Sequence, residues 1–125
     1  MYYGTTPQEG YRADVDKNFR SRMEANFYRF VTWCHPDIRL CEYEPKLFTE
    51  KDGMPKGVHY LPDFRLTTHA GEHIYIEVCA FMDNYHKNKC GAFQKATGHR
   101  LEIVDNKVYS EIKRRFAKKT KGWEW

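Results

Sequence analysis

Two carboxylates, Asp63 and Glu77, are the side chains of this 125-residue chain whose type and spacing best suit chemistry. Glu77 lies between Ile76 and Val78 in an apolar segment, where a charged side chain is costly unless a cation, a donor or water faces it. Asp63 comes 14 residues earlier, directly after Pro62, which can end a strand and release Asp63 from regular pairing. In strands joined by a short turn, both carboxylates can approach one divalent ion. Hard oxygen ligands completed by a substrate phosphate are the usual Mg²⁺ arrangement.

A helix ahead of these strands supplies a third acid. Apolar residues recur at spacings of three and four from Phe19 to Cys34, which predicts a helix. Asp16 can cap its start, and Pro36 ends it because the residue before a proline disfavours helical geometry. Glu24 falls at the edge of the apolar stripe, so we expect its carboxylate to face a cleft without being buried in the core.

The rest of the chain alternates as three strands, a helix, a strand and a helix. The predicted ranges are 39–49, 59–67 and 73–81 for the strands, 84–96 for a helix ended by Gly98, 100–104 for the last strand, and a last helix capped by Asp105. In 73–81, alternation places Glu77 and Cys79 on one face and Ile76 on the other. The order αβββαβα predicts a single-domain α/β fold, a mixed β-sheet flanked by helices. We expect a turn-rich N-terminal arm (1–15), this domain (16–117) and a loose, basic and aromatic C-terminal tail (118–125).

Several stretches resemble a known nuclease pattern. Pro62-Asp63 followed by Glu77-Val78-Cys79 resembles the signature of the PD-(D/E)XK nuclease superfamily, in which two acids and a lysine line one cleft. Glu24 stands where that superfamily has an additional helical carboxylate, and αβββαβ is its common core. The chain is also similar to small phage and mobile-element endonucleases related to Holliday-junction resolvases, over about residues 16–115. The stretches that carry this similarity are Arg20-Ser21-Arg22-Met23-Glu24-Ala25, Tyr43-Glu44-Pro45, Tyr60-Leu61-Pro62-Asp63-Phe64 and Tyr75-Ile76-Glu77-Val78.

The resemblance implies a restriction-endonuclease-like core and a Mg²⁺-dependent, structure-selective DNA endonuclease that hydrolyses phosphodiester bonds. Mn²⁺ is expected to substitute for Mg²⁺, and no small-molecule cofactor is expected. Asp63 and Glu77 would bind the ion with the carbonyl of Val78, and Glu24 would bind a second ion or orient water. A domain this small does not cut two strands symmetrically by itself, so a resolvase role implies a C2 homodimer.

The family pattern has a lysine where this chain has Cys79, and a cysteine supplies no permanent cation. That lysine is held to activate the attacking water and to stabilise charge that develops on the phosphate. In other members of the superfamily the lysine has moved to a neighbouring element. The nearest candidates here are Lys46, Lys87, Lys89 and Lys95. The alternative is a catalytically impaired DNA-binding module of the same fold.

Charge is distributed unevenly along the chain, whose formal net charge is +4. Residues 36–85 carry five basic and nine acidic side chains, whereas the flanking stretches carry 16 basic and eight acidic ones. A locally acidic middle within a basic frame suits a protein that holds metal ions and a polyanion around them. The residues expected to contact DNA phosphates are Arg20, Arg22, Lys46, Lys87, Lys89, Lys95, Lys113, Arg114 and Lys118.

The cysteines offer a third hypothesis, a small zinc-stabilised interaction domain. It requires four or more of Cys34, His35, Cys41, His86 and Cys90 to converge, although the chain has no CxxC pair. Buried free cysteines in a reducing compartment are the simpler interpretation. Because no apolar run approaches the length of a membrane span and the first residues do not read as a signal peptide, we expect an intracellular, cytoplasmic protein with no membrane contact. The resemblance also suggests that the protein could be encoded by a phage and act inside the host cell.

Overall fold

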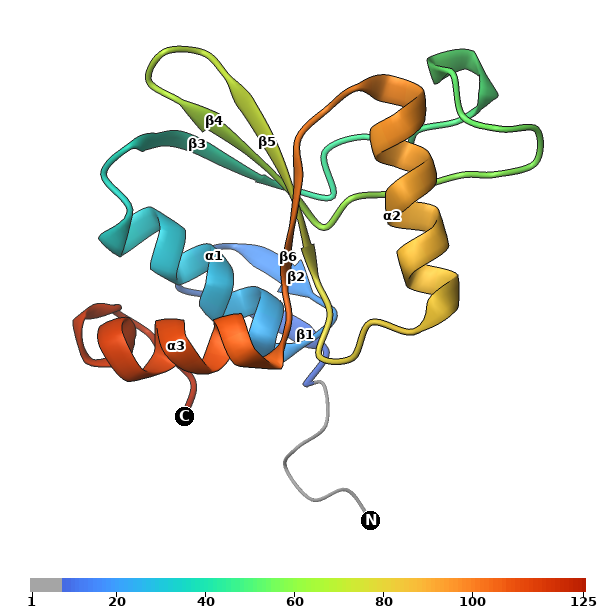
Figure 1. The fold of residues 1–125 in the computed structure, drawn as a ribbon. Coiled ribbons are helices and arrows are strands. Elements are labelled where there is room, and N and C mark those ends of the chain that lie inside the picture. The colour runs from blue at the N-terminus through green and yellow to red at the C-terminus, as the bar shows by residue number, and fades with distance from the viewer. Residues whose placement is uncertain (1–7) are drawn as a thin grey trace.

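A four-stranded mixed sheet forms the centre of the computed structural model, which describes residues 8–125 (Figure 1). The strand order is β3-β4-β5-β6, with β5 and β6 parallel and the other neighbours antiparallel. The strands are β3 (Ile38–Tyr43), β4 (Phe64–Thr68), β5 (His73–Val78) and β6 (Leu101–Val104). Because helices lie on both faces of this sheet, the predicted α/β class with a mixed sheet flanked by helices is confirmed.

The two faces of the sheet bury separate apolar clusters. The helices are α1 (Arg22–Cys34), α2 (Asn84–Thr97) and α3 (Asn106–Phe116). On the face covered by α1 and α3, Phe27 packs with Ile76; on the face covered by α2, Phe93 packs with Tyr75. Since neighbouring residues of a strand point to opposite faces, Glu77 lies on the α2 side, as alternation predicted. Among residues 8–125, no helix has the length and apolar character that crossing a lipid bilayer requires.

A β-hairpin replaces the first part of the predicted helix. Its strands are β1 (Gly10–Arg12) and β2 (Lys17–Phe19), and Asp16 has a φ of 52° in the turn between them. Asp16 therefore does not cap α1; Ser21 does, because its Oγ accepts the N–H of Glu24 at 3.1 Å. The helical periodicity misplaced the start because Phe19, on β2, enters the same core as α1. The predicted arm thus includes β1, and its residues 1–7 lie outside the described part of the chain.

The connection between β3 and β4 leaves the sheet, so both strands are shorter than the predicted 39–49 and 59–67. Glu44 has a φ of 46° and ends β3. Beyond it, Phe48 and Tyr60 form an isolated antiparallel bridge around a short 3-10 turn, η1 (Glu50–Asp52). Tyr60 packs on Phe93 of α2 at 5.1 Å between ring centroids. The connection therefore places its last residues against α2.

The later helix boundaries agree with the sequence. Asp83 caps α2 by accepting the N–H of His86 at 2.8 Å, and Gly98 ends it with a φ of 71°, a conformation that favours glycine. Asp105 caps α3 by accepting the N–H of Val108 at 2.9 Å. The predicted roles of Gly98 and Asp105 are confirmed.

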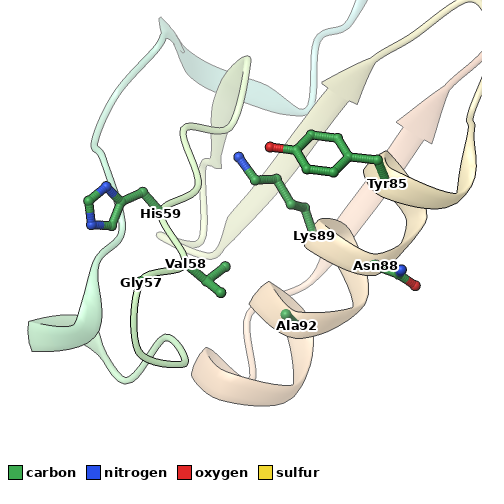
Figure 2. Close-up of a pocket in the computed structure, with 7 residues that line it drawn as sticks. All are labelled: Gly57, Val58, His59, Tyr85, Asn88, Lys89 and Ala92. Carbon is green, nitrogen blue, oxygen red and sulfur yellow. The ribbon is translucent and has the colours of Figure 1, made fainter.

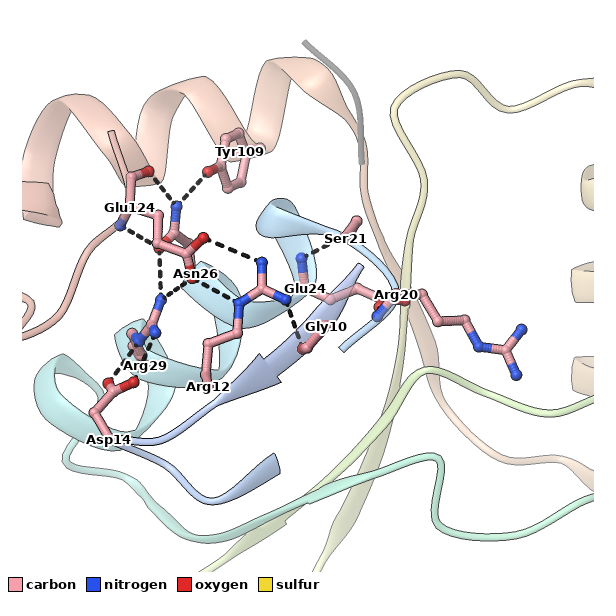
Figure 3. A network of polar contacts seen from close by, with 10 residues as sticks. All are labelled: Gly10, Arg12, Asp14, Arg20, Ser21, Glu24, Asn26, Arg29, Tyr109 and Glu124. Atoms are coloured by element: carbon pink, nitrogen blue, oxygen red, sulfur yellow. Dashed lines mark hydrogen bonds and ion pairs between the residues drawn. The ribbon is translucent and has the colours of Figure 1, made fainter. Parts of the chain in front are cut away.

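The C-terminal tail is packed, which contradicts the prediction that it is loose. A second 3-10 turn, η2 (Ala117–Lys119), leads into it, and Trp123 is buried in the α1 core. Figure 3 shows the contacts that hold the tail: Glu124 pairs with Arg12 of β1 at 2.9 Å and with Arg29 of α1 at 2.7 Å. Arg29, whose side chain is 3% exposed, also pairs with Asp14 at 2.8 Å. One guanidinium on α1 therefore anchors both ends of the described chain.

We predict that Arg29→Met lowers the free energy of unfolding by about 3 kcal/mol, because it leaves the Asp14 and Glu124 carboxylates without their shared cation. Urea unfolding at neutral pH measures the change. Arg39→Met, at an exposed position on β3, is the matched control and should change the value by less than about 0.5 kcal/mol. An equal effect of the two substitutions would contradict the anchoring role.

Candidate functional site

Asp63 lies directly before β4, outside the regular pairing, as the preceding proline predicted. Its backbone carbonyl accepts the N–H of Glu44 at 2.7 Å, and its Oδ2 accepts the N–H of Val78 at 2.7 Å. The second bond joins the start of β4 to the end of β5. The Asp63 carboxylate is thereby held beside the strand that carries Glu77.

Glu77 occupies the next-to-last position of β5 and is 8% exposed. Its Oε1 accepts the hydroxyl of Tyr60 at 2.5 Å. Burial raises the pKa of Glu77 above its usual range, while the Tyr60 hydrogen bond and the nearby His86 and Lys89 of α2 oppose that rise. The Glu77 carboxylate therefore faces α2 and lies close enough to His86 and Lys89 of that helix for both side chains to lower its pKa.

Glu24, in the first turn of α1, is 6% exposed and so more buried than its place at the edge of the apolar stripe predicted. Its Oε1 accepts the backbone N–H of Arg20 at 2.9 Å and the hydroxyl of Tyr43 at 2.8 Å. The Tyr43 ring, from β3, packs on Phe19 beside the first turn of α1. The Arg20 side chain pairs instead with Glu44 at 3.0 Å.

The three acids Glu24, Asp63 and Glu77 form one electrostatic unit, which we call the carboxylate cluster. Burial and the neighbouring charges of Glu77 and Glu24, together with a hydrogen bond to the Glu24 carboxyl, raise the pKa of Asp63 to about 9. Asp63 therefore holds its proton at neutral pH. The donor set consists of hard oxygens, which fits a divalent ion such as Mg²⁺.

The cluster is not a preformed metal cage. Among residues 8–125, no three His, Cys, Asp or Glu side chains are arranged so that they could hold a metal ion as they stand. One oxygen of each cluster acid is committed to a protein donor, from Tyr43, Tyr60 or the backbone of Val78. An ion would have to recruit the remaining oxygens by side-chain rotation.

Cys79 lies directly after β5, and its N–H donates to the carbonyl of Val104 at 3.0 Å. Its Sγ donates to the carbonyl of Phe81 at 2.9 Å. Burial raises the pKa of the Cys79 thiol, and the charges of Glu77 and Asp63 raise it further. Cys79 thus lies beside the carboxylate cluster, where sequence alternation placed it, and remains a neutral thiol there.

Of the four lysines considered as replacements for the family lysine, Lys89 lies near the carboxylate cluster, since its charge acts on Glu77. Lys46 is held elsewhere by Asp52, at 2.7 Å. Lys87 and Lys95 are exposed, and at 100° per residue Lys87 leaves α2 on the flank opposite Lys89.

Sequence reasoning missed the groups that hold the acids. Tyr43 and Tyr60 donate to Glu24 and Glu77, and neither was predicted to contact an acid. A usable signal was present, because each tyrosine belongs to one of the short stretches that carry the family resemblance. His86 was considered only as a zinc ligand, whereas it lies close to Glu77.

The zinc hypothesis is wrong for the residues proposed. Cys34, on α1, contacts Thr120 at 3.3 Å, whereas Cys90, on α2, contacts the Tyr60 hydroxyl at 3.8 Å on the other face of the sheet. His35 packs against Phe30. The four cysteines are free thiols.

The basic residues expected to contact DNA do not gather on one surface. Lys87, Lys89 and Lys95 lie on α2, whereas the α3 side carries a separate group. That group surrounds a hollow of about 330 Å³ lined by Ser110, Lys113, Arg114, Lys118 and Trp125. Arg20 lies next to the carboxylate cluster through Glu44, and Arg22 lies near Tyr109 of α3.

Comparison with known proteins adds no relative, because no family model, curated protein or solved structure matches this chain. Any assignment of function therefore depends on the cluster and its surroundings.

The raised pKa of Asp63 predicts a pH-dependent effect of Asp63→Asn in metal-free buffer. Between the unfolded value near 4 and the folded value of about 9, only the unfolded chain releases this proton, so stability falls as pH rises. The asparagine variant removes that loss and should gain roughly 2–4 kcal/mol of unfolding free energy at pH 8, with little change at pH 4.

Urea unfolding at the two pH values measures this difference. Asp37→Asn, at an exposed position before β3, is the matched control and should change little at either pH. A gain for Asp63→Asn that is the same at pH 4 and pH 8 would show that Asp63 titrates normally.

Proposed function

We propose that this protein is a Mg²⁺-dependent DNA endonuclease with a restriction-endonuclease-like core. The observation that carries the proposal is the carboxylate cluster: buried Glu24 in the first turn of α1, half-buried Asp63 before β4 and buried Glu77 at the end of β5 form one electrostatic unit. These are the elements on which the family resemblance expects them. A cluster with this burial and these mutual pKa effects is a costly arrangement unless a cation is bound there.

In this proposal Asp63 and Glu77 hold the ion together with the carbonyl of Val78, and Glu24 holds a second ion or orients water. A bound Mg²⁺ polarises the scissile phosphate and lowers the pKa of a coordinated water. The tyrosine hydroxyls fix Glu24 and Glu77 by occupying one oxygen of each, which leaves their other oxygens for the ion. Mn²⁺, which also takes oxygen ligands, is expected to substitute.

Lys89 is the residue we assign to the role of the absent family lysine. Its charge reaches Glu77 from α2, whereas Cys79 is neutral at the position where the family has the lysine. A permanent cation there stabilises the charge that develops on the phosphate during hydrolysis.

The proposed substrate is branched or otherwise structured DNA, cut by a C2 homodimer. The basic residues lie on both sides of the sheet, on α2 and beside α3 (Figure 1). Such a distribution favours contacts to phosphates of more than one DNA segment over recognition of one base sequence.

The second candidate is a DNA-binding module of the same fold that has lost turnover. The neutral Cys79 thiol beside the acids favours it. This module would bind junction, flap or duplex DNA and give no Mg²⁺-dependent product.

We predict that Asp63→Asn and Glu77→Gln each reduce Mg²⁺-dependent cleavage by at least about 100-fold, because each removes a ligand charge from the ion. DNA affinity should stay equal or rise, since a negative charge near phosphate is lost. The experiment incubates labelled four-way junction, flap and duplex DNA with and without Mg²⁺ or Mn²⁺. Glu72→Gln, in the exposed turn before β5, is the control. Binding without any cleavage by the unaltered protein would favour the second candidate.

For the cation we predict that Lys89→Ala lowers cleavage by about 100-fold without weakening DNA binding. Lys87→Ala, two residues away on the opposite flank of α2, is the matched control and should retain activity. Cys79→Lys should add nothing to the unaltered protein but should restore cleavage to Lys89→Ala, since the new lysine enters the same space beside Glu77. Full cleavage activity of Lys89→Ala would contradict the assignment of Lys89 to the role of the family lysine.

A further inference from the structure

A cavity of about 520 Å³ lies between α2 and the segment 57–59, next to the carboxylate cluster (Figure 2). Its lining consists of Gly57, Val58, His59, Tyr85, Asn88, Lys89 and Ala92. Lys89 belongs both to this lining and to the surroundings of Glu77. His59 precedes Tyr60, which donates to Glu77. Lys89 and the chain segment 59–60 therefore connect the cavity with the surroundings of Glu77.

The aromatic ring of Tyr85 is the most accessible apolar surface in this lining. Tyr85 is 63% exposed, and the Lys89 ammonium lies 5.1 Å from its ring centroid. Figure 2 shows both side chains projecting from α2 toward the 57–59 segment. The ring is thus held at the mouth of the cavity by a cation instead of being packed into the core. Such a ring offers a face on which a planar group can stack.

The remaining lining has the chemistry of a nucleotide site. Val58 and Ala92 provide apolar contact, and Lys89 is the ionisable group of the α2 wall that can face a phosphate (Figure 2). None of the described lining residues is acidic. A cavity of this volume lies within the range that small-ligand sites occupy.

We infer that this cavity binds an unpaired nucleotide of DNA, with its base stacked on Tyr85 and its phosphate near Lys89. The inference rests on the proposed function, because it takes DNA as the substrate, and it narrows the substrate class to DNA with an unpaired base beside the cleaved phosphate. A base inside a duplex is stacked on both sides and does not reach the ring without being extruded. Bulges, flaps and junction centres present such a base at lower cost.

Binding is tested without metal, so that cleavage does not interfere. The probes are two duplexes carrying 2-aminopurine, one with the analogue paired and one with it in a single-nucleotide bulge, titrated in EDTA. Anisotropy of a terminal dye gives affinity, and 2-aminopurine fluorescence reports stacking. We expect the bulged duplex to bind about tenfold more tightly, with quenching of its 2-aminopurine. Tyr85→Ala should abolish both effects, and Tyr85→Phe should retain them.

The control for loss of an aromatic surface is Trp33→Ala. Trp33, on α1 and outside this cavity, is 55% exposed with the Lys121 ammonium 5.6 Å from its ring. This variant should keep the preference for the bulge. The inference is overturned if Tyr85→Ala keeps that preference, if both duplexes bind the unaltered protein equally, or if free deoxyadenosine monophosphate competes at the concentration of bulged DNA.

Cleavage assays with Mg²⁺ on the same duplexes separate the two claims. If paired and bulged DNA are cut equally, the inference about the cavity is wrong and the proposed nuclease function stands. A Tyr85-dependent preference for the bulge without cutting removes the nuclease function and keeps the cavity as a binding site.

Discussion

Electrostatic repulsion among three neighbouring acids, buried Glu24 and Glu77 and half-buried Asp63, is the constraint on which the arrangement of this end of the sheet depends. Two tyrosine hydroxyls and one backbone N–H each take one oxygen of a different acid and so fix its direction. These donors are neutral, and they leave much of the negative charge in place. The proton that Asp63 retains removes one negative charge from the cluster and so lowers the repulsion among the three acids.

Two parts of the chain act together on the side of the carboxylate cluster that faces α2. They are the long connection between β3 and β4, and α2 itself. The connection brings in the Tyr60 hydroxyl, and α2 brings in the positive charge of Lys89. Their contact, through the Tyr60 and Phe93 rings, belongs to the second apolar cluster. Positive charge is therefore supplied by a helix whose placement depends on core packing, and not by the strand that carries Glu77.

Local signals explain what could be predicted from the sequence. Strand alternation around Glu77 and the proline before Asp63 act within a few residues, so both acids were placed correctly. The burial of Glu24 depends on Tyr43 from another strand, which no helical period contains. The ordered tail depends on Arg29 and Glu124, which are 95 residues apart, so composition alone suggested a loose end. The errors fall where a long-range contact overrides a local pattern.

The Arg29 anchor also sets an order of events during synthesis. Asp14 and Arg29 leave the ribosome before Glu124, which follows Arg29 by 95 residues. Until then the guanidinium has one carboxylate, and the side of α1 that receives Trp123 is uncovered. A nascent chain stalled short of this point would expose apolar surface at α1 and invite chaperones or proteases. The α1 core is therefore complete only after Trp123 and Glu124 have been added.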